Sequence, residues 1–206
     1  YKCTFCDWGS MTYSKVKKFN LEKIAEELEW VKRNPISYLY VADANFGMFK
    51  ERDLEIARML KAAADESTVD LISVQSAKQS TEVVFQIGKV LGDKYAGVDI
   101  AMQSMHDETL KAIERKNLDT NNIQRLMGLS EQYGVPTYTE MILGLPLETK
   151  ESWATGLTQL LELGQHNSIE VWITQMLQNS ELNNQESRIK YGIKTVMVKD
   201  YITLKS

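Results

Sequence analysis

Hydrophobic residues recur with the period of an α-helix in several long segments of the chain. Leu21, Ile24 and Leu28, for instance, are three and four residues apart, so they share one face of a helix. Asn20 directly precedes this run and is a residue type that caps helix N-termini. The pattern predicts helices over 21–33, 53–64, 80–91, 107–115, 120–133 and 150–163.

Short apolar runs lie between the helical segments, at 37–42, 70–74, 97–102, 137–143 and 169–174. Such runs are typical of parallel strands that helices cover, and their alternation with helices indicates βαβ units. We therefore predict an α/β fold, a partial (β/α)6 TIM-like barrel with parallel strands. The 206 residues fall short of the ~250 of a complete eight-fold barrel. We expect 1–206 to be a single-domain fragment whose first strand lies just before Tyr1.

Polar or glycine-containing segments follow these apolar runs directly, at 43–46, 75–78, 103–104, 144–146 and 175–180. In folds with parallel strands, binding and catalytic groups sit at the carboxyl ends of the strands. We therefore expect these segments to share one rim of the molecule. A cysteine pair near the start of the chain would follow the missing first strand and reach the same rim.

Composition narrows the classes of function. The chain has 24 basic and 28 acidic residues, a net charge of −4, which gives no support for a nucleic-acid-binding surface. It has no apolar run of the ~18–20 residues that span a bilayer. Its two cysteines exclude a disulfide-dense scaffold.

Cys3 and Cys6 are the sharpest chemical feature. Two thiolates at this spacing can hold one metal or cluster from a single loop. The spacing alone leaves open half a zinc site, a dithiol redox pair and part of an iron–sulfur motif. The two histidines, His106 and His166, have no metal-ligand spacing to a partner.

The segment Tyr-Lys-Cys-Thr-Phe-Cys at 1–6 resembles the end of Cys-x-x-x-Cys-x-aromatic-Cys, the cluster motif of radical S-adenosylmethionine (radical SAM) enzymes. The first cysteine of that motif would lie two residues before Tyr1. Segment 138–149 is similar to the fifth-strand Gly-x-Ile-x-Gly region of that family, and 103–115 resembles its fourth strand and helix. Segment 43–46 stands where its second strand meets the cofactor's amino group. The combination looks most like the branch with an N-terminal cobalamin-binding domain.

The resemblance implies a [4Fe–4S] cluster and S-adenosylmethionine as cofactors, with cobalamin as a further candidate on an upstream domain outside this chain. Reductive cleavage of S-adenosylmethionine would then drive radical methyl transfer or rearrangement of an unidentified small-molecule substrate. It also implies an electron donor such as flavodoxin or ferredoxin. Cysteines that must be reduced to bind a cluster fit a cytoplasmic location, and the charge and the lack of a long apolar run indicate no nucleic-acid or membrane partner. The fragment lacks the first cluster cysteine, so we expect it to be inactive alone.

The resemblance also assigns site residues. Cys3 and Cys6 would ligate the cluster, Phe5 and Ile142 would pack near the cofactor, and Gly144 and Leu145 would approach the adenine. Candidates for polar contacts with cofactor or substrate are Asp43, Asn45, Gln103, Ser104, Arg115 and Glu140.

Several positions depart from the family pattern or have a simpler interpretation. Asp43-Ala44-Asn45 stands where many members have Gly-Gly-Glu, and these residues also favour turns and caps. Glu140 and Leu147 replace small residues of the fifth-strand motif. Gln103-Ser104 could cap a helix, and Arg115 could be a solvated helix end. A second hypothesis for the whole chain is a non-catalytic, barrel-like binding or scaffold module whose Cys-x-x-Cys holds zinc or no metal.

Overall fold

The computed structural model describes residues 3–7, 17–76 and 82–197. Strands and helices alternate along this part of the chain, as the sequence pattern predicts. The strands are β1 (Tyr38–Phe46), β2 (Leu71–Ser76), β3 (Val98–Asp99), β4 (Thr137–Leu143) and β5 (Ser168–Ile173). The helices are α1 (Leu21–Lys32), α2 (Lys50–Asp65), α3 (Glu82–Leu91), α4 (Asp107–Ala112), α5 (Thr120–Tyr133), α6 (Lys150–Glu162) and α7 (Gln185–Lys190), with 3-10 turns η2 (Gly92–Lys94) and η3 (Glu181–Asn183).

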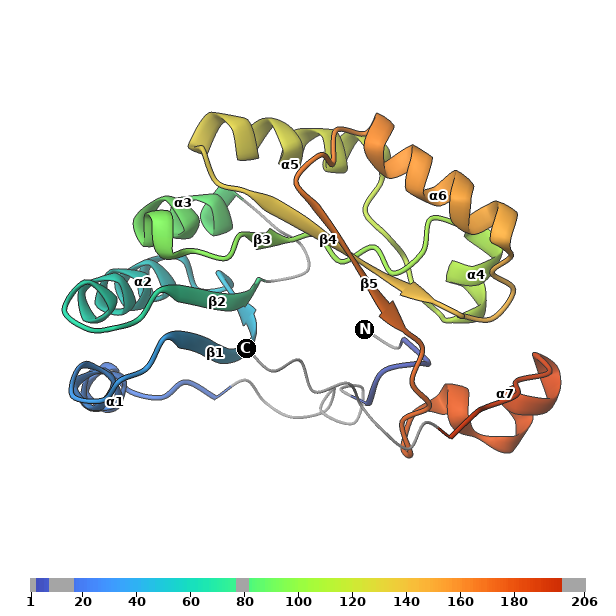
Figure 1. Ribbon diagram of the computed structural model, residues 1–206, viewed down its shortest axis with the longest axis horizontal. Coiled ribbons are helices and arrows are strands. Elements are labelled where there is room, and N and C mark those ends of the chain that lie inside the picture. Colours follow the sequence, from blue (N-terminus) through green and yellow to red (C-terminus); the bar gives the residue numbers. More distant parts are fainter. Residues whose placement is uncertain (1–2, 8–16, 77–81, 198–206) are drawn as a thin grey trace.

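All strand pairs in the described residues are parallel. β1 pairs with β2, and β3, β4 and β5 form a second sheet in that order. The two sheets meet where the Ala96 N–H donates to the Ile72 carbonyl at 2.9 Å. Figure 1 shows α1 to α6 on the outside of the resulting arc of strands. This arrangement confirms the predicted partial barrel.

The hydrophobic core fills the layer between the helices and the arc. β4 illustrates the pattern, because Thr139 and Met141 are buried toward the helices whereas Glu140 and Ile142 point to the other face and are only half-buried. Gly88 of α3 allows close packing in this layer, since a Cβ there would lie 2.5 Å from the Val135 side chain. The inner face of β4, with Tyr138, Glu140 and Ile142, lies on the other side of the strand from this layer.

Most predicted elements agree with the structure to within a few residues, and α5 and β4 agree at both ends. α2 begins at Lys50, three residues earlier than predicted, so Asp53 lies within its first turn. α4 ends at Ala112 and not at Arg115. Regular pairing in β3 covers only Val98–Asp99, although the Ile100 N–H still donates to the Tyr138 carbonyl at 2.8 Å. Positions 80 and 81 of the predicted third helix lie outside the described residues.

Candidate functional site

The loop that carries the two cysteines is held from both sides. Within it, the Cys6 N–H donates to the Cys3 carbonyl at 3.1 Å. The Thr4 N–H donates to Ile113 at the end of α4 at 3.1 Å, and the Thr4 carbonyl accepts from the Leu182 N–H of η3 at 2.7 Å. Cys3 is buried and Cys6 half-buried, and both are thiols, not a disulfide. The predicted cluster ligands therefore lie on a fixed turn.

Arg115 lies beside this loop because of how α4 ends. Glu114 adopts a left-handed φ of 50°, and the Arg115 N–H donates to the Leu110 carbonyl at 2.9 Å, which is a Schellman ending. This turn carries the chain off the helix axis. The interpretation of Arg115 as a solvated helix end is therefore wrong, since its side chain is half-buried and bonded.

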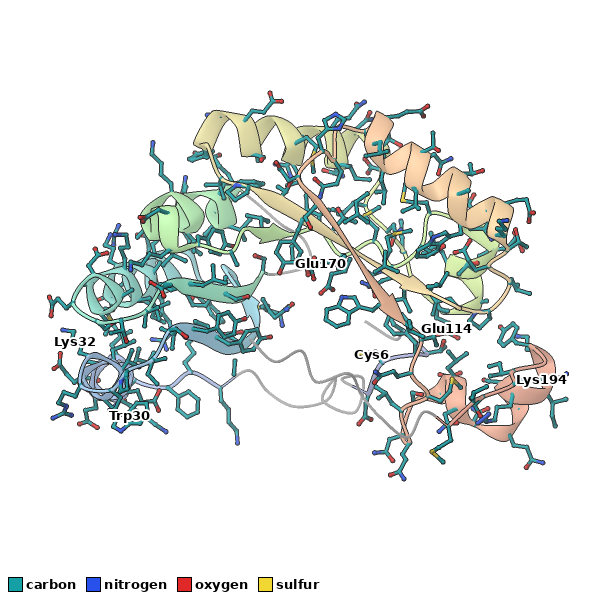
Figure 2. The ribbon with its side chains drawn as sticks, in the orientation of Figure 1. Cys6, Trp30, Lys32, Glu114, Glu170 and Lys194 are labelled. Carbon is teal, nitrogen blue, oxygen red and sulfur yellow. The ribbon has the colours of Figure 1, made fainter. Side chains whose placement is uncertain are left out.

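The guanidinium of Arg115 donates to three different groups. Its Nη1 lies 3.8 Å from Cys3 Sγ, its Nε lies 3.0 Å from Asn117 Oδ1, and its Nη2 donates to the Ala101 carbonyl. A positive donor on the sulfur suits a thiolate, because hydrogen bonds to charged acceptors are the strong ones. The Thr4 N–H bond to Ile113 brings the cysteine loop to the end of α4, and Figure 2 labels Cys6 and Glu114 in this part of the molecule.

Gln103 and Ser104 connect the end of β3 to its neighbours. Gln103 is buried with an unusual left-handed φ of 67°, and its backbone exchanges hydrogen bonds of 2.8 Å with Glu140 and Ile142. The Ser104 hydroxyl donates to Glu148 and accepts the His106 N–H at 3.0 Å. His106 itself occupies the N-cap of α4 without a capping side chain, so Ser104 supports the helix start from two residues upstream.

Glu140 lies on the inner face of the arc, next to Glu170 of β5 in the strand register. Burial, and after it the charge of Glu170, raises the pKa of Glu140, and Trp172 partly offsets the shift. Burial and the nearby carboxylates likewise raise the pKa of Tyr138 on the same face. Figure 2 shows Glu170 on the inner side of the strands. The inner face thus combines carboxylates with aromatic side chains.

The loop after β4 turns at Gly144, which has a φ of 93°. The side chain of Leu145 is buried, so only its backbone can approach a ligand. Glu148 follows and accepts hydrogen bonds from Ser104 and Ser152. Ser152 and Thr149 also form a capping box at the start of α6, which anchors the loop at its far end.

Asp43 and Asn45 lie at the end of β1, and Asp43 Oδ1 accepts the Asn45 N–H at 2.8 Å. This bond closes a turn of the kind that aspartate and asparagine favour. The loop is fixed from below by Asp53, a buried carboxylate that accepts the N–H groups of Gly47 and Phe49, both at 2.9 Å. These bonds are local and order the chain between the end of β1 and the start of α2.

The structure thus brings some predicted residues together and adds others. Cys3 is bonded to Arg115, and Gln103 is bonded through its backbone to Glu140 and Ile142. Sequence reasoning missed Asp53, Asn117, Glu148, Glu170 and Leu182 as members of these arrangements. Glu148 lies in segment 138–149, which resembles the fifth-strand region of the family, and could have been found there. Asn117 and Leu182 carry no local signal.

The donor chemistry at the cysteine loop suits an iron–sulfur cluster, which is held by thiolates. Thr4, between the two cysteines, also has a buried hydroxyl without a hydrogen-bond partner among the described residues. Within residues 3–7, 17–76 and 82–197, no three His, Cys, Asp or Glu side chains are grouped to hold a metal. A structural zinc takes four ligands, so the thiol pair by itself completes neither kind of site. No helix in the described part of the chain is long and apolar enough to cross a bilayer.

Two curated proteins resemble the chain along 205 residues, which is 98% of the chain but only 30% of each relative. The 2-(S-pantetheinyl)-carbapenam-3-carboxylate methyltransferase of Streptantibioticus cattleyicolor is 42% identical. The cobalamin-dependent radical SAM methyltransferase TokK of Streptomyces tokunonensis is 40% identical. The chain therefore spans less than a third of the length of these relatives.

Solved structures share the fold at low sequence identity. Coproporphyrinogen III oxidase (HemN) from Escherichia coli, described as a radical SAM enzyme, matches with a TM-score of 0.60 and 18% identity over 86% of this chain and 42% of its own. Methylornithine synthase (PylB) matches with a TM-score of 0.60 and 14% identity over 88% of this chain and 52% of its own. The radical S-adenosylmethionine methyltransferase TsrM from Kitasatospora setae matches with a TM-score of 0.58 and 16% identity, covering 83% of this chain and 34% of its own.

The family model described as the radical SAM superfamily matches residues 1–157. This match covers the cysteine loop, the predicted fourth- and fifth-strand motifs and most of the arc of strands. The chain therefore belongs to the radical SAM superfamily.

Proposed function

We propose that the chain is the catalytic core of a cobalamin-dependent radical SAM methyltransferase that acts on a small molecule. Both curated relatives are named methyltransferases, and one is named cobalamin-dependent, at 42% and 40% identity over 98% of the chain. Because the chain spans 30% of each relative, the cobalamin-binding domain and much of the substrate site would belong to other parts of a longer protein.

Cys3 and Cys6 would bind the [4Fe–4S] cluster together with one cysteine from outside this sequence. The two backbone bonds of Thr4, to Ile113 and Leu182, support this role because they fix the turn that carries both cysteines. When bound, the cluster supplies the electron that cleaves the sulfonium of S-adenosylmethionine. Phe5, half-buried in the same turn, would pack near the cofactor.

The inner face of β4 and the segment that follows β3 would hold the rest of S-adenosylmethionine. Gln103 and Glu140 are adjacent there, and an amide beside a carboxyl suits the hydroxyl groups of a ribose. Ser104 and Arg115 would add polar contacts. Ile142 lies on the same face as Glu140 and would pack on the adenosyl group.

Two loops would complete the cofactor site. Gly144 and the backbone of Leu145 would approach the adenine, because a left-handed glycine lets the backbone come close to a ligand. Asp43 and Asn45 would accept hydrogen bonds from the ammonium group. Their fixed turn above Asp53 supports this role, since it presents oxygen acceptors without further ordering.

An electron donor such as flavodoxin or ferredoxin would reduce the cluster in a cytoplasmic setting. A thiol pair that must stay reduced to bind iron supports this location. Methyl transfer is favoured over the rearrangement that the sequence left open, because both relatives carry the methyltransferase name.

The observation that carries the proposal is the clamped cysteine turn beside Arg115, in a chain that resembles methyltransferases along nearly its full length. The test uses the full-length parent protein, reconstituted anaerobically with iron and sulfide and then reduced. S-adenosylmethionine with a labelled methyl group and hydroxocobalamin are the probes. We expect S-adenosylmethionine cleavage and a labelled cobalamin, and loss of both in Cys3→Ser and Cys6→Ser. The exposed His166→Ala variant is the matched control.

Three results would count against the proposal in different ways. A well-formed cluster without any cleavage of S-adenosylmethionine would overturn the radical SAM activity. Cleavage without label on cobalamin would overturn the methyl transfer. One zinc per chain and no iron after reconstitution would favour the binding or scaffold module.

A further inference from the structure

A continuous path of hydrogen bonds joins the loop after β4 to Cys3. Glu148 accepts from the Ser104 hydroxyl, and the Ser104 carbonyl accepts from Asn117 Nδ2 at 2.7 Å. Asn117 Oδ1 then accepts from Arg115 Nε at 3.0 Å, and Arg115 Nη1 reaches Cys3 Sγ at 3.8 Å. The path spans three segments of the chain and ends on a predicted cluster ligand.

Asn117 is the link that the proposed function does not use. Its amide accepts with oxygen and donates with nitrogen, so it connects a guanidinium to a backbone carbonyl. An aspartate at this position could accept the hydrogen bond from Arg115 but could not donate one to Ser104, and a leucine could form neither bond. Asn117 is half-buried, which limits competition from water for both bonds.

The geometry of Arg115 explains why it needs such a link. The Schellman ending of α4 fixes its backbone through the 2.9 Å bond to Leu110, but the long side chain retains many rotamers unless its donors are bonded. The Ala101 carbonyl holds Nη2 and Asn117 holds Nε. Together these two acceptors aim Nη1 at Cys3.

We infer that Asn117 is a positioning residue that holds the guanidinium of Arg115 against Cys3. The inference rests on the proposed function, because it assigns a cluster ligand to Cys3. Donors to cluster sulfurs stabilise the more negative, reduced form, so hydrogen bonding is one of the factors that set the reduction potential. Loss of the Asn117 amide therefore lowers the potential of the cluster and weakens its retention.

The test compares the reconstituted full-length parent protein with Asn117→Leu, Arg115→Gln and the double variant. The readouts are the midpoint potential of the cluster, followed by electron paramagnetic resonance, and the iron retained after exposure to a chelator. We expect a lower potential and about 10–100-fold faster loss of iron in Asn117→Leu, as is usual for residues that orient metal ligands. Asn121→Leu, at an exposed asparagine of α5, is the matched control and should leave both readouts unchanged.

The double variant separates positioning from a general structural role. If Asn117 acts through Arg115, Asn117→Leu changes nothing further in the Arg115→Gln background, because the two substitutions remove the same contact. Additive effects would overturn the inference, as would an unchanged potential in Asn117→Leu. Should the leucine variant fail to fold by circular dichroism, Asn117→Ala removes the amide without adding apolar bulk and is judged by the same cycle.

The outcome is separable from that of the proposed function. A wild-type protein that cleaves S-adenosylmethionine while Asn117→Leu keeps its potential would defeat only this inference. A wild-type protein that assembles no cluster would defeat the proposed function and this inference with it.

Discussion

Glu140 and Glu170 are direct partners in the parallel register of β4 and β5. Burial is the larger cause of the raised pKa of Glu140, and the charge of Glu170 is the second. Two acidic residues therefore act on each other here, and the charge of Arg115 offsets their effect on Glu140 only in part.

This pair makes stability depend on pH. The pKa of Glu140 is above its usual value of 4.5 in the folded chain, so between 4.5 and the raised value the folded state binds more protons than the unfolded state. The free energy of unfolding then falls as pH rises through that window. We expect Glu140→Gln to be more stable than the wild type above the window, with the difference shrinking toward pH 4.5. Urea unfolding at a series of pH values measures it.

Glu170→Gln is the matched variant for the same effect. It removes the charge of Glu170, which is the second cause of the raised pKa, and leaves burial, so the pKa of Glu140 should fall. Carbon-13 NMR of the carboxyl group reports the pKa directly. A pKa of Glu140 that does not move in Glu170→Gln would show that the two carboxyl groups are not coupled.

Asp53 supports the loop of Asp43 and Asn45 from inside. Asp53→Leu leaves the Gly47 and Phe49 N–H groups without their acceptor. This loss costs about 1–3 kcal/mol for the buried Gly47 amide and less for the part-buried Phe49 amide. Asp53→Asn keeps one oxygen acceptor and should lose less. Chemical denaturation measures the free energy of unfolding for both variants.

Asp65→Asn is the control on the same helix, because Asp65 forms an exposed ion pair with Lys61 at 2.6 Å. Exposed pairs contribute about 0–1 kcal/mol. Equal losses in Asp53→Leu and Asp65→Asn would mean that the buried carboxylate does not hold the loop.

Local signals explain how much of the fold could be predicted. Asp119 caps α5 and Gly134 ends it with a φ of 64°, and both are residue types that mark helix ends. The end of α4 lacks such a mark, because the left-handed residue there is Glu114. The predicted helix therefore ran too far and included Arg115.

The candidate site was less predictable for a related reason. Cys3 and Cys6 could be identified because they are separated by only two residues in the sequence and belong to a known motif. Asn117 is an ordinary polar residue in the loop that also carries Arg115, and its role depends on the fold bringing the Ser104 carbonyl to its other side. Such a role is a property of the tertiary structure and leaves no period or spacing in the sequence.

Gly144 has the backbone conformation that the loop after β4 requires. Its φ of 93° is rarely adopted by residues with a Cβ, although a Cβ would meet nothing closer than 3.5 Å, at Thr174. Gly144→Ala should therefore cost about 1–3 kcal/mol through backbone strain alone. Thermal unfolding with a two-state fit measures the loss.

Gly128 is a control glycine with an ordinary helical backbone conformation. It lies within α5, and apart from the backbone of its own helix and its two chain neighbours a Cβ there would meet no atom within 4 Å. Gly128→Ala should stabilise the chain by about 0.5–1 kcal/mol, since alanine is the better helix former. If both alanine variants lost stability alike, the conformation of Gly144 would not be the cause.

Leu182 of η3 anchors the cysteine turn to the C-terminal part of the described chain. Its side chain is fully buried, and its N–H donates to the Thr4 carbonyl at 2.7 Å. Leu182→Ala creates a cavity that should cost about 2–5 kcal/mol and should loosen the turn. We then expect Cys3, which is buried in the wild type, to react faster with a thiol reagent under native conditions.

Leu147→Ala is the matched control for this effect, because Leu147 is 52% exposed and truncation there should change stability by less than about 0.5 kcal/mol. The labelled cysteine is identified by peptide mass spectrometry, so that Cys3 is distinguished from the more exposed Cys6. Faster labelling of Cys3 in Leu182→Ala, at a temperature where the variant stays folded, would show that η3 holds the turn closed. Unchanged labelling together with lower stability would mean that Leu182 supports the core without controlling the cysteine loop.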